Sequence, residues 1–193
     1  MPFRITRTIL IAAMFTGSLS GCAGVLIGGA ATGASVATDA RTAGTMLDDE
    51  TIELKAAKYL TDNKELFDKT HVNFTSYNNI VLVSGEAPTE ALRDQVINMV
   101  RNIQKVRKVY DEITISAPSS MVSRSSDTLI TGKVKTQLFS LKDFPAGKIK
   151  VVTEKGVVYL LGLVSQKVAD RATDVARKVG GVQRVVKLFE YTG

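Results

Sequence analysis

The sequence contains one cysteine, Cys22, and one histidine, His71. A lone cysteine cannot form a disulfide within the chain, so the usual covalent support of a small secreted domain is missing. The 193 residues, 45% of them hydrophobic, suffice for one ordinary domain or for two small domains with thin cores. From Cys22 onward the net charge is +4, which is mildly basic at most.

The first residues have the pattern of an export signal. Arg4 and Arg7 precede an apolar stretch, 9–15, that is too short to cross a bilayer, and small residues follow it. Residues 19–22, Leu-Ser-Gly-Cys, resemble a lipobox, in which the cysteine thiol takes a diacylglyceryl group and becomes the mature N-terminus. We therefore expect a signal peptide at 1–21 and lipidation of Cys22, with the acyl chains anchoring the protein on a membrane.

Catalytic and metal-binding groups are scarce in the rest of the chain. With Cys22 modified by lipid, His71 alone cannot form a Cys/His pair, a His-based triad or a zinc cluster. The acidic run 48–50 could hold a cation or act as an acid pair, but it is expected at a helix N-terminus, where negative charge is stabilising. We expect no enzymatic activity, no metal site and no cofactor besides the covalent lipid, although carboxylate chemistry stays open.

A tether is expected over 22–47, because this segment is rich in small residues and has neither a helical nor a strand period. A flexible segment of about 25 residues reaches roughly 28 Å, which keeps the following domain close to the lipid surface. Gly28, Gly29 and Gly33 could suggest a nucleotide-binding loop. No strand precedes them and no helix with a placed acidic partner follows, so we reject that interpretation.

The remainder of the chain repeats itself with a period of about 77 residues. Ile52 corresponds to Ile130, the run 80–85 corresponds to 157–162, and Val109 corresponds to Val185. The offset changes only slightly along the chain, which requires two single-residue gaps at expected turns. The sequence therefore predicts two copies of one module, at 48–115 and 127–193, joined by a linker at 116–126.

Each copy has the element order αββαβ by hydrophobic period. In the first copy a helix is followed by a hairpin that turns at Asn78 and Asn79, which tolerate positive φ. A second helix begins after Thr89, a good N-cap, and a last strand covers 109–115. The expected inward stripes of the two helices are Ile52, Ala56, Tyr59 and Leu60, and then Leu92, Val96, Met99, Val100 and Ile103.

The second copy repeats this order with a helix near 127–141 and a hairpin about Lys155 and Gly156. Its second helix begins near Ser165, and a strand covers 185–191. The expected inward residues of that helix are Val168, Ala172, Val175, Ala176 and Val179. Two helices on one face of a three-stranded mixed sheet would bury these stripes, so the expected fold class is α+β, with two tandem modules.

The runs 81–85 (Val-Leu-Val-Ser-Gly) and 158–164 (Val-Tyr-Leu-Leu-Gly-Leu-Val), each followed by a helix and a strand, resemble the BON domain. With its lipobox and tether, the whole chain resembles outer-membrane lipoproteins that carry two BON domains. The resemblance implies a non-catalytic protein on the periplasmic face of the outer membrane that supports envelope integrity. It also implies phospholipid binding by the second module.

The two modules have opposite charge. The first has 9 basic and 12 acidic side chains, net −3, whereas the segment from Arg124 to the end has 13 basic and 6 acidic, net +7. Each basic residue near an anionic lipid surface contributes about 1 kcal/mol of attraction at moderate salt. Only the second module is therefore suited to anionic phospholipid.

The first helix of the second module has a candidate lipid-binding face. If Ile130, Val134, Leu138 and Leu141 face the core, a rotation of 100° per residue places another set on or beside the opposite side. This set is Leu129, Gly132, Lys133, Lys135, Thr136 and Phe139. Apolar groups beside lysines are typical of a helix that lies in a membrane interface. The matching residues of the first module are Thr51 and Thr61.

Two functions remain open. In the first, the second module is a peripheral binder of anionic phospholipid. In the second, the paired modules are a scaffold for outer-membrane assembly proteins, with Leu129 and Phe139 as the partner patch. A third outcome is that these two side chains pack against the first module or a loop. The resemblance implies an aromatic residue where Leu129 stands, so a leucine predicts shallower insertion. We expect no nucleic-acid partner, because the basic module lacks exposed aromatic residues among its lysines.

Overall fold

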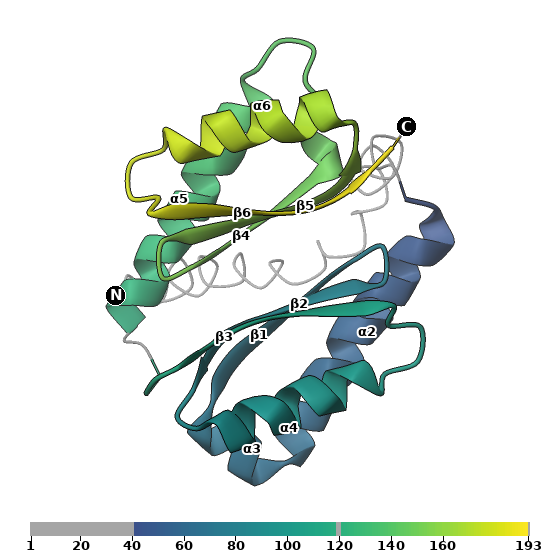
Figure 1. Cartoon of the computed structure of the whole chain (residues 1–193), viewed down its shortest axis with the longest axis vertical. Helices are drawn as coiled ribbons and strands as arrows, with labels where there is room; N and C mark the ends of the chain where they lie inside the picture. Colours follow the sequence, from purple (N-terminus) through teal and green to yellow (C-terminus); the bar gives the residue numbers. More distant parts are fainter. Residues whose placement is uncertain (1–40, 119–120, 193) are drawn as a thin grey trace, which may run out of the picture. The chain divides into compact units, whose positions relative to one another are not determined.

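The computed structural model describes residues 41–118 and 121–192, without the side chain of Met121. Cys22, the expected signal peptide and most of the expected tether lie outside these residues. The described residues contain two modules with the same order of elements (Figure 1). The first comprises α2 (Ala43–Asp62), α3 (Lys64–Lys69), β1 (His71–Tyr77), β2 (Ile80–Ala87), α4 (Glu90–Arg101) and β3 (Lys108–Ile115). The second comprises α5 (Met121–Phe139), the 3-10 turn η2 (Ala146–Lys148), β4 (Ile149–Glu154), β5 (Val157–Val164), α6 (Gln166–Arg177) and β6 (Arg184–Tyr191).

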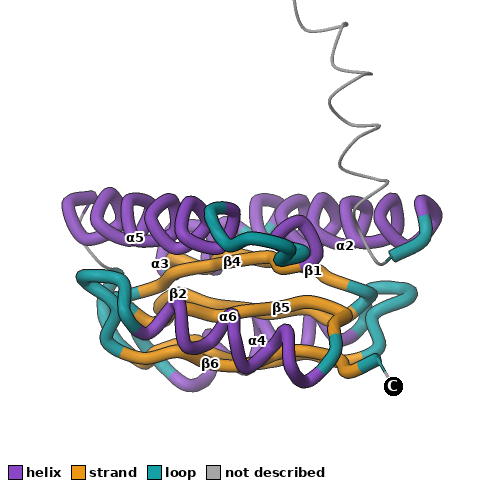
Figure 2. The backbone as a smooth tube through the Cα atoms, turned by 90° about the horizontal axis from the view of Figure 1, so that it is seen from above, coloured by secondary structure: helices purple, strands orange, loops and turns teal. Residues whose placement is uncertain are grey.

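Each module has a mixed three-stranded sheet covered by helices, which confirms the expected α+β fold. In the first sheet β2 lies between β1, its antiparallel partner, and β3, its parallel partner, and the second sheet repeats this with β5 in the centre. Figure 1 shows α2 and α4 on one face of the first sheet, and α5 and α6 on one face of the second. The first helix of each module runs along the antiparallel edge strand, β1 or β4 (Figure 2).

The two hairpins turn where the sequence predicts. Asn78 and Asn79 have φ of 53° and 63°, and Lys155 and Gly156 have φ of 49° and 73°. Successive positive φ angles give a tight turn whose twist matches that of the flanking strands. Thr89 caps α4 as expected, because its side chain accepts a hydrogen bond from the N–H of Leu92. These elements follow from local sequence chemistry alone.

The helices that open the modules begin earlier than expected. α2 begins at Ala43, where the Thr42 side chain accepts a hydrogen bond from the N–H of Thr45, so residues 43–47 of the expected tether are helical. α5 begins at Met121, so residues 121–126 of the expected linker are helical as well. The apolar period starts only at Ile52 and Ile130, where these helices reach the core, and it therefore misses the preceding turns. The short helix α3 was not expected either.

Each module has its own core, and most of the expected inward residues line it. Ile52, Ala56 and Leu60 are buried on α2, but Tyr59 is 47% exposed and the expectation for it was wrong. On α6, Ala169 and Thr173 are buried, whereas Val168 and Val175 are only partly buried. The buried face of α6 is thus shifted toward Ala169 and Thr173, because the closest approach to the sheet is made by small side chains.

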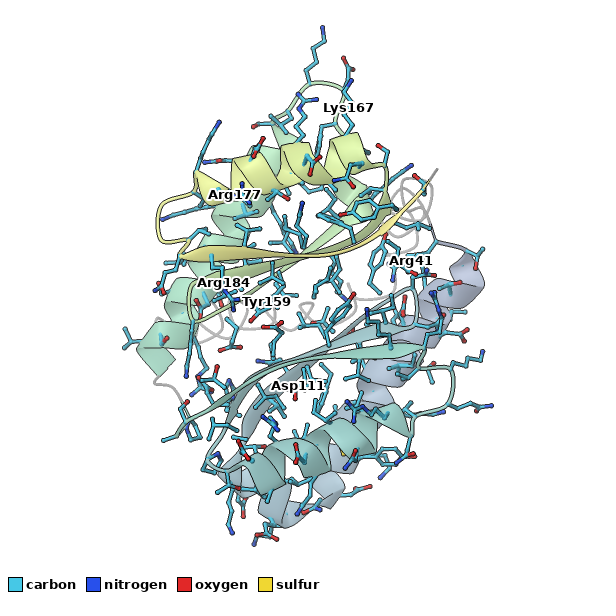
Figure 3. The ribbon with its side chains drawn as sticks, in the orientation of Figure 1. Arg41, Asp111, Tyr159, Lys167, Arg177 and Arg184 are labelled. Carbon is cyan, nitrogen blue, oxygen red and sulfur yellow. The ribbon has the colours of Figure 1, made fainter. Side chains whose placement is uncertain are left out.

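A third apolar cluster joins the two modules on the sheet faces away from the helices. It contains Tyr77, Leu82, Tyr159, Leu161 and Leu188. Ion pairs between the two modules border it, and Figure 3 labels Tyr159 of the cluster and Arg184 of one ion pair. These pairs are Arg107 with Glu190 at 2.6 Å and Arg184 with Glu112 at 3.8 Å. The described residues of the two modules consequently belong to one compact unit.

Candidate functional site

The buried stripe of α5 is the one that the sequence predicts. Ile130, Val134 and Leu138 are at most 5% exposed, and Leu141 packs against the same core just after the helix. Their contacts with the second sheet fix the rotation of α5 about its axis. The opposite side of α5 therefore has a defined orientation, away from the core of its own module.

All six residues of the candidate lipid-binding face on α5 are exposed. Leu129 is 65% exposed and Phe139 is 67% exposed, so neither side chain is covered by the first module or by a loop. They are two of the large apolar side chains that the described residues leave in solvent. The face is free to contact a membrane or another protein.

A shallow hollow of about 440 Å³ lies between the side chains of this face. It is lined by Thr128, Leu129, Gly132, Lys133, Thr136 and Gln137. Gly132 is one of these lining residues, and a Cβ atom added at Gly132 would meet nothing within 4 Å. The Thr136 hydroxyl donates to the carbonyl of Gly132, so this polar group is satisfied within the helix. The hollow gives a small apolar group access to the helix backbone.

The lysines of this face have no acidic partner. Among the described residues, neither Lys133 nor Lys135 forms an ion pair, and the acidic Asp127 on the same helix is buried. Their positive charge is therefore directed to solvent. Apolar side chains flanked by uncompensated lysines match the chemistry of an anionic interface, where apolar groups enter below the head groups and ammonium groups meet phosphates.

The equivalent face of α2 has polar side chains at the positions of Leu129 and Phe139. Thr51 and Thr61 replace the two apolar residues, and their hydroxyls donate to the carbonyls of Leu47 and Lys58 on the same helix. Lys58 pairs with Asp62 at 2.8 Å, so its charge is largely compensated. The first module thus has no apolar side chains at the positions of Leu129 and Phe139, whereas Leu54, at the position of Gly132, is exposed.

The acidic run 48–50 does not cap a helix, and that expectation was wrong. Asp49 is 2% exposed and lies in the second turn of α2. Its carboxylate accepts from the N–H groups of Asn78 and Asn79, both at 2.8 Å, and from the Ser76 hydroxyl at 2.6 Å. Arg41, labelled in Figure 3, donates to it at 2.6 Å. Asp49 therefore holds the hairpin turn, and all its oxygen lone pairs face structural donors.

His71 lies at the first position of β1 and is partly buried. Arg124 approaches its ring, with Nη1 3.3 Å from Nδ1. No group of three histidine, cysteine, aspartate or glutamate side chains in residues 41–118 and 121–192 is arranged to hold a metal ion. None of the helices in the described part of the chain is both long and apolar enough to cross a membrane.

Sequence reasoning missed two features of this surface. One is a group of carboxylates between the modules: Glu86 is fully buried with Lys155 at 3.1 Å, and Glu154 lies nearby. Burial, and then the charges of Glu86 and Asp127, raise the pKa of Glu154. Burial beside Glu112 likewise raises the pKa of Tyr159.

The second missed feature is an apolar groove on the first module, beside Leu54 and Phe67. Neither has a local sequence pattern, since each is assembled from distant segments.

Comparison with known proteins agrees with this architecture. The BON domain model matches residues 48–117 and 126–193, which are the two modules. The outer membrane lipoprotein DolP of Haemophilus influenzae is 37% identical over 190 residues, covering 98% of this chain and 97% of that protein. The 21 kDa hemolysin of Actinobacillus pleuropneumoniae is 35% identical and covers 79% of each chain. Osmotically-inducible protein Y of Escherichia coli is 28% identical, covering 74% of this chain and 72% of that protein.

The match to the Haemophilus lipoprotein extends over almost the full length, including the segment before the modules. The protein is therefore located at the outer membrane, where a lipid anchor holds it. With two matched domains that together cover most of its length, this chain belongs to the BON-domain family, as a two-module protein similar to an outer-membrane lipoprotein.

Proposed function

We propose that acyl chains on Cys22 hold this protein on the periplasmic face of the outer membrane, where the second module binds anionic phospholipid through the exposed face of α5. The observation that carries the proposal is the pairing of Leu129 and Phe139, both about two-thirds exposed, with Lys133 and Lys135, which have no acidic partner in the described residues. In this role the protein supports envelope integrity as a binding module, without catalysis and without a further cofactor.

The expected binding free energy of this face is sufficient for a membrane contact that the lipid anchor assists. Complete burial of a leucine or phenylalanine side chain contributes about 1.5–3 kcal/mol, and each lysine near anionic head groups adds about 1 kcal/mol. Part of this is lost to ordering of the side chains, so the face alone binds weakly. An anchor that confines the module to the surface raises its effective concentration there, and weak binding then suffices to orient the module.

The first module offers no competing lipid contact in this proposal. Its net charge of −3 opposes anionic head groups, and the face equivalent to that of α5 has threonines in place of large apolar groups. The two modules therefore divide the work: one contacts lipid and the other remains available for a different partner.

Vesicle sedimentation with residues 23–193, which lack the acylated cysteine, tests the proposal. We expect binding to vesicles that contain phosphatidylglycerol and no binding to phosphatidylcholine vesicles. Leu129→Glu or Lys133→Glu should each weaken binding about fivefold or more, because each places a negative charge at the anionic surface.

Two variants serve as controls for these changes. Thr51→Glu makes the equivalent change on α2, and Lys167→Glu on α6, labelled in Figure 3, changes the net charge as Lys133→Glu does. Both should bind anionic vesicles nearly as the parent protein does. If Lys167→Glu and Lys133→Glu weaken binding equally, net charge rather than the α5 face causes the attraction.

A scaffold for outer-membrane assembly proteins is the second candidate. The hollow beside Leu129 favours it, since an apolar side chain of a partner could enter there as well as a lipid chain. Absence of vesicle binding by the parent protein would favour this function over the first.

A further inference from the structure

The first module has an apolar groove bounded by α2, α3 and the edge strand β1, which we call the α2–β1 groove. Its volume is about 580 Å³. It is lined by Glu50, Glu53, Leu54, Ala57, Leu60, Thr61, Phe67, Val72, Asn73 and Phe74. Leu60 and Val72 are buried and form the floor, whereas Leu54 is 71% exposed and Phe67 is 53% exposed. The walls are thus large apolar side chains in contact with solvent.

Helix α3 holds one wall of the α2–β1 groove in place. The Asn63 side chain accepts from the N–H of Leu66 at the start of α3, and Leu66 is buried in the core. This arrangement fixes the six-residue helix and directs the next residue, Phe67, outward. The second module has only the 3-10 turn η2 in the corresponding stretch, and Gly132 occupies the position equivalent to Leu54. The groove is therefore particular to the first module.

The charges around the groove are acidic. Glu50 and Glu53 line it, and within the described residues Glu50 has no ion-pair partner. Glu53 accepts from Lys150 at 2.8 Å and from the N–H of Ser76 at 2.7 Å, so its carboxylate is fixed at the rim and its charge is largely compensated, which leaves Glu50 as the uncompensated acid of the lining within the described residues. The module as a whole has a net charge of −3. An anionic lipid would be repelled here, whereas lysine or arginine side chains would be attracted.

We propose that the α2–β1 groove binds an amphipathic segment of another protein that carries lysine or arginine beside its apolar residues. Its apolar side chains pack between Leu54, Phe67 and Phe74, and its basic side chains meet Glu50, which has no ion-pair partner within the described residues. Apolar anchors in a groove with a complementary charged rim are the usual form of helix-in-groove recognition. The groove shares no lining residue with the hollow of the α5 face.

Photo-crosslinking with the full-length lipoprotein in living cells tests this proposal. A photoreactive amino acid replaces Leu54 or Phe67, and the crosslinked peptide of the partner is mapped by mass spectrometry. The control position is Leu47, which is 65% exposed on the same helix but does not line the groove. We expect one protein to crosslink at both groove positions and not at the control, through a segment with apolar residues and two or more basic residues.

A charge reversal makes the test specific. Glu50→Lys in the photoreactive chain should reduce the crosslink yield about fivefold, whereas Asp94→Lys on α4, with the same change of net charge, should leave it unchanged. Crosslinks to lipid, to a second copy of this chain or to an acidic segment would each overturn the proposal, as would equal yields at position 47. Absence of crosslinks at both groove positions would also overturn it. Leu54→Glu and Phe67→Glu should leave vesicle binding unchanged, which separates this proposal from lipid binding by α5.

Discussion

The carboxylate of Asp127 on α5 accepts hydrogen bonds from the backbone N–H of Gly156, at 2.8 Å, and of its neighbour Lys155, at 2.9 Å. Asp49 makes the equivalent bonds to Asn78 and Asn79 in the first module. In both modules one aspartate therefore ties the opening helix to the turn of the following hairpin. This aspartate link fixes the distance between the helix and the sheet. In the second module it holds α5, the helix that presents the candidate lipid-binding face.

Asp127→Ala tests the energy of this link. The substitution leaves the N–H groups of Lys155 and Gly156 without their charged acceptor, and Gly156 is buried. We expect the free energy of unfolding, measured by urea denaturation, to fall by about 3 kcal/mol. Asp174→Ala on α6 removes an exposed aspartate that pairs with Arg177 at 3.8 Å, and it should change stability by less than about 0.5 kcal/mol. Equal effects of the two substitutions would contradict the role of Asp127.

Two glycines should respond oppositely to alanine. Gly85 has a φ of 125°, and a Cβ atom there would lie 2.0 Å from the carbonyl oxygen of His71 on the paired strand. We expect Gly85→Ala to cost about 3 kcal/mol or more of unfolding free energy, because the clash is with backbone and φ is unfavourable. Gly132 lies in a helix with open space at Cβ, and Gly132→Ala should stabilise by about 0.5–1 kcal/mol. Thermal unfolding of both variants checks the contrast.

Glu154 makes the free energy of unfolding depend on pH, in a direction that follows from its raised pKa. Its pKa is raised above the usual 4.5, chiefly by burial, so the ionised form costs stability at neutral pH. Glu154→Gln should therefore increase the free energy of unfolding at pH 7, while its side-chain oxygen can still accept from Asn73. The advantage should shrink as the pH falls through the raised pKa and vanish below about 4, where Glu154 is protonated in both folded and unfolded states.

Glu65→Gln is the matched control, because its hydrogen bond with Lys69 lowers the pKa of Glu65. Here the parent protein should be the slightly more stable one at pH 7. The difference should disappear as the pH falls below the ordinary value of 4.5. Urea titrations at pH 7, 5.5 and 4 distinguish the two signs, and the same sign for both variants would contradict the assignment.

The sequence predicts the parts of this molecule that depend on nearby residues. The turn at Asn78 and the cap at Thr89 depend on residues a few positions away, and the stripe of Ile130, Val134 and Leu138 fixes the outward side of α5 by helical geometry. The role of Asp49 could not be predicted, because its partners Asn78 and Asn79 lie about 30 residues away and meet it only when the hairpin packs on α2.

The missed features have the same physical cause. Helix α3 has six residues, too few to show a period, and its register depends on the buried Leu66 and the Asn63 cap. The alternation of β2 could suggest that Glu86 leaves the core, but only the second sheet supplies the cover that buries it. The outward face of a helix can thus be predicted from the sequence of that helix alone, whereas a surface made by two distant segments cannot.

Leu129→Trp tests the α5 face with a spectroscopic probe, because the chain has no other tryptophan. A larger aromatic group should enter deeper below the head groups than leucine, so binding to anionic vesicles should tighten by about threefold to tenfold. The fluorescence maximum should move to shorter wavelength when vesicles are added, because the indole leaves water. Thr51→Trp on α2 provides the matched control and should keep its solvent-exposed emission in the presence of the same vesicles. A blue shift of equal size in both variants would show that the protein does not distinguish its two modules at the membrane, and the face assigned to α5 would then be wrong.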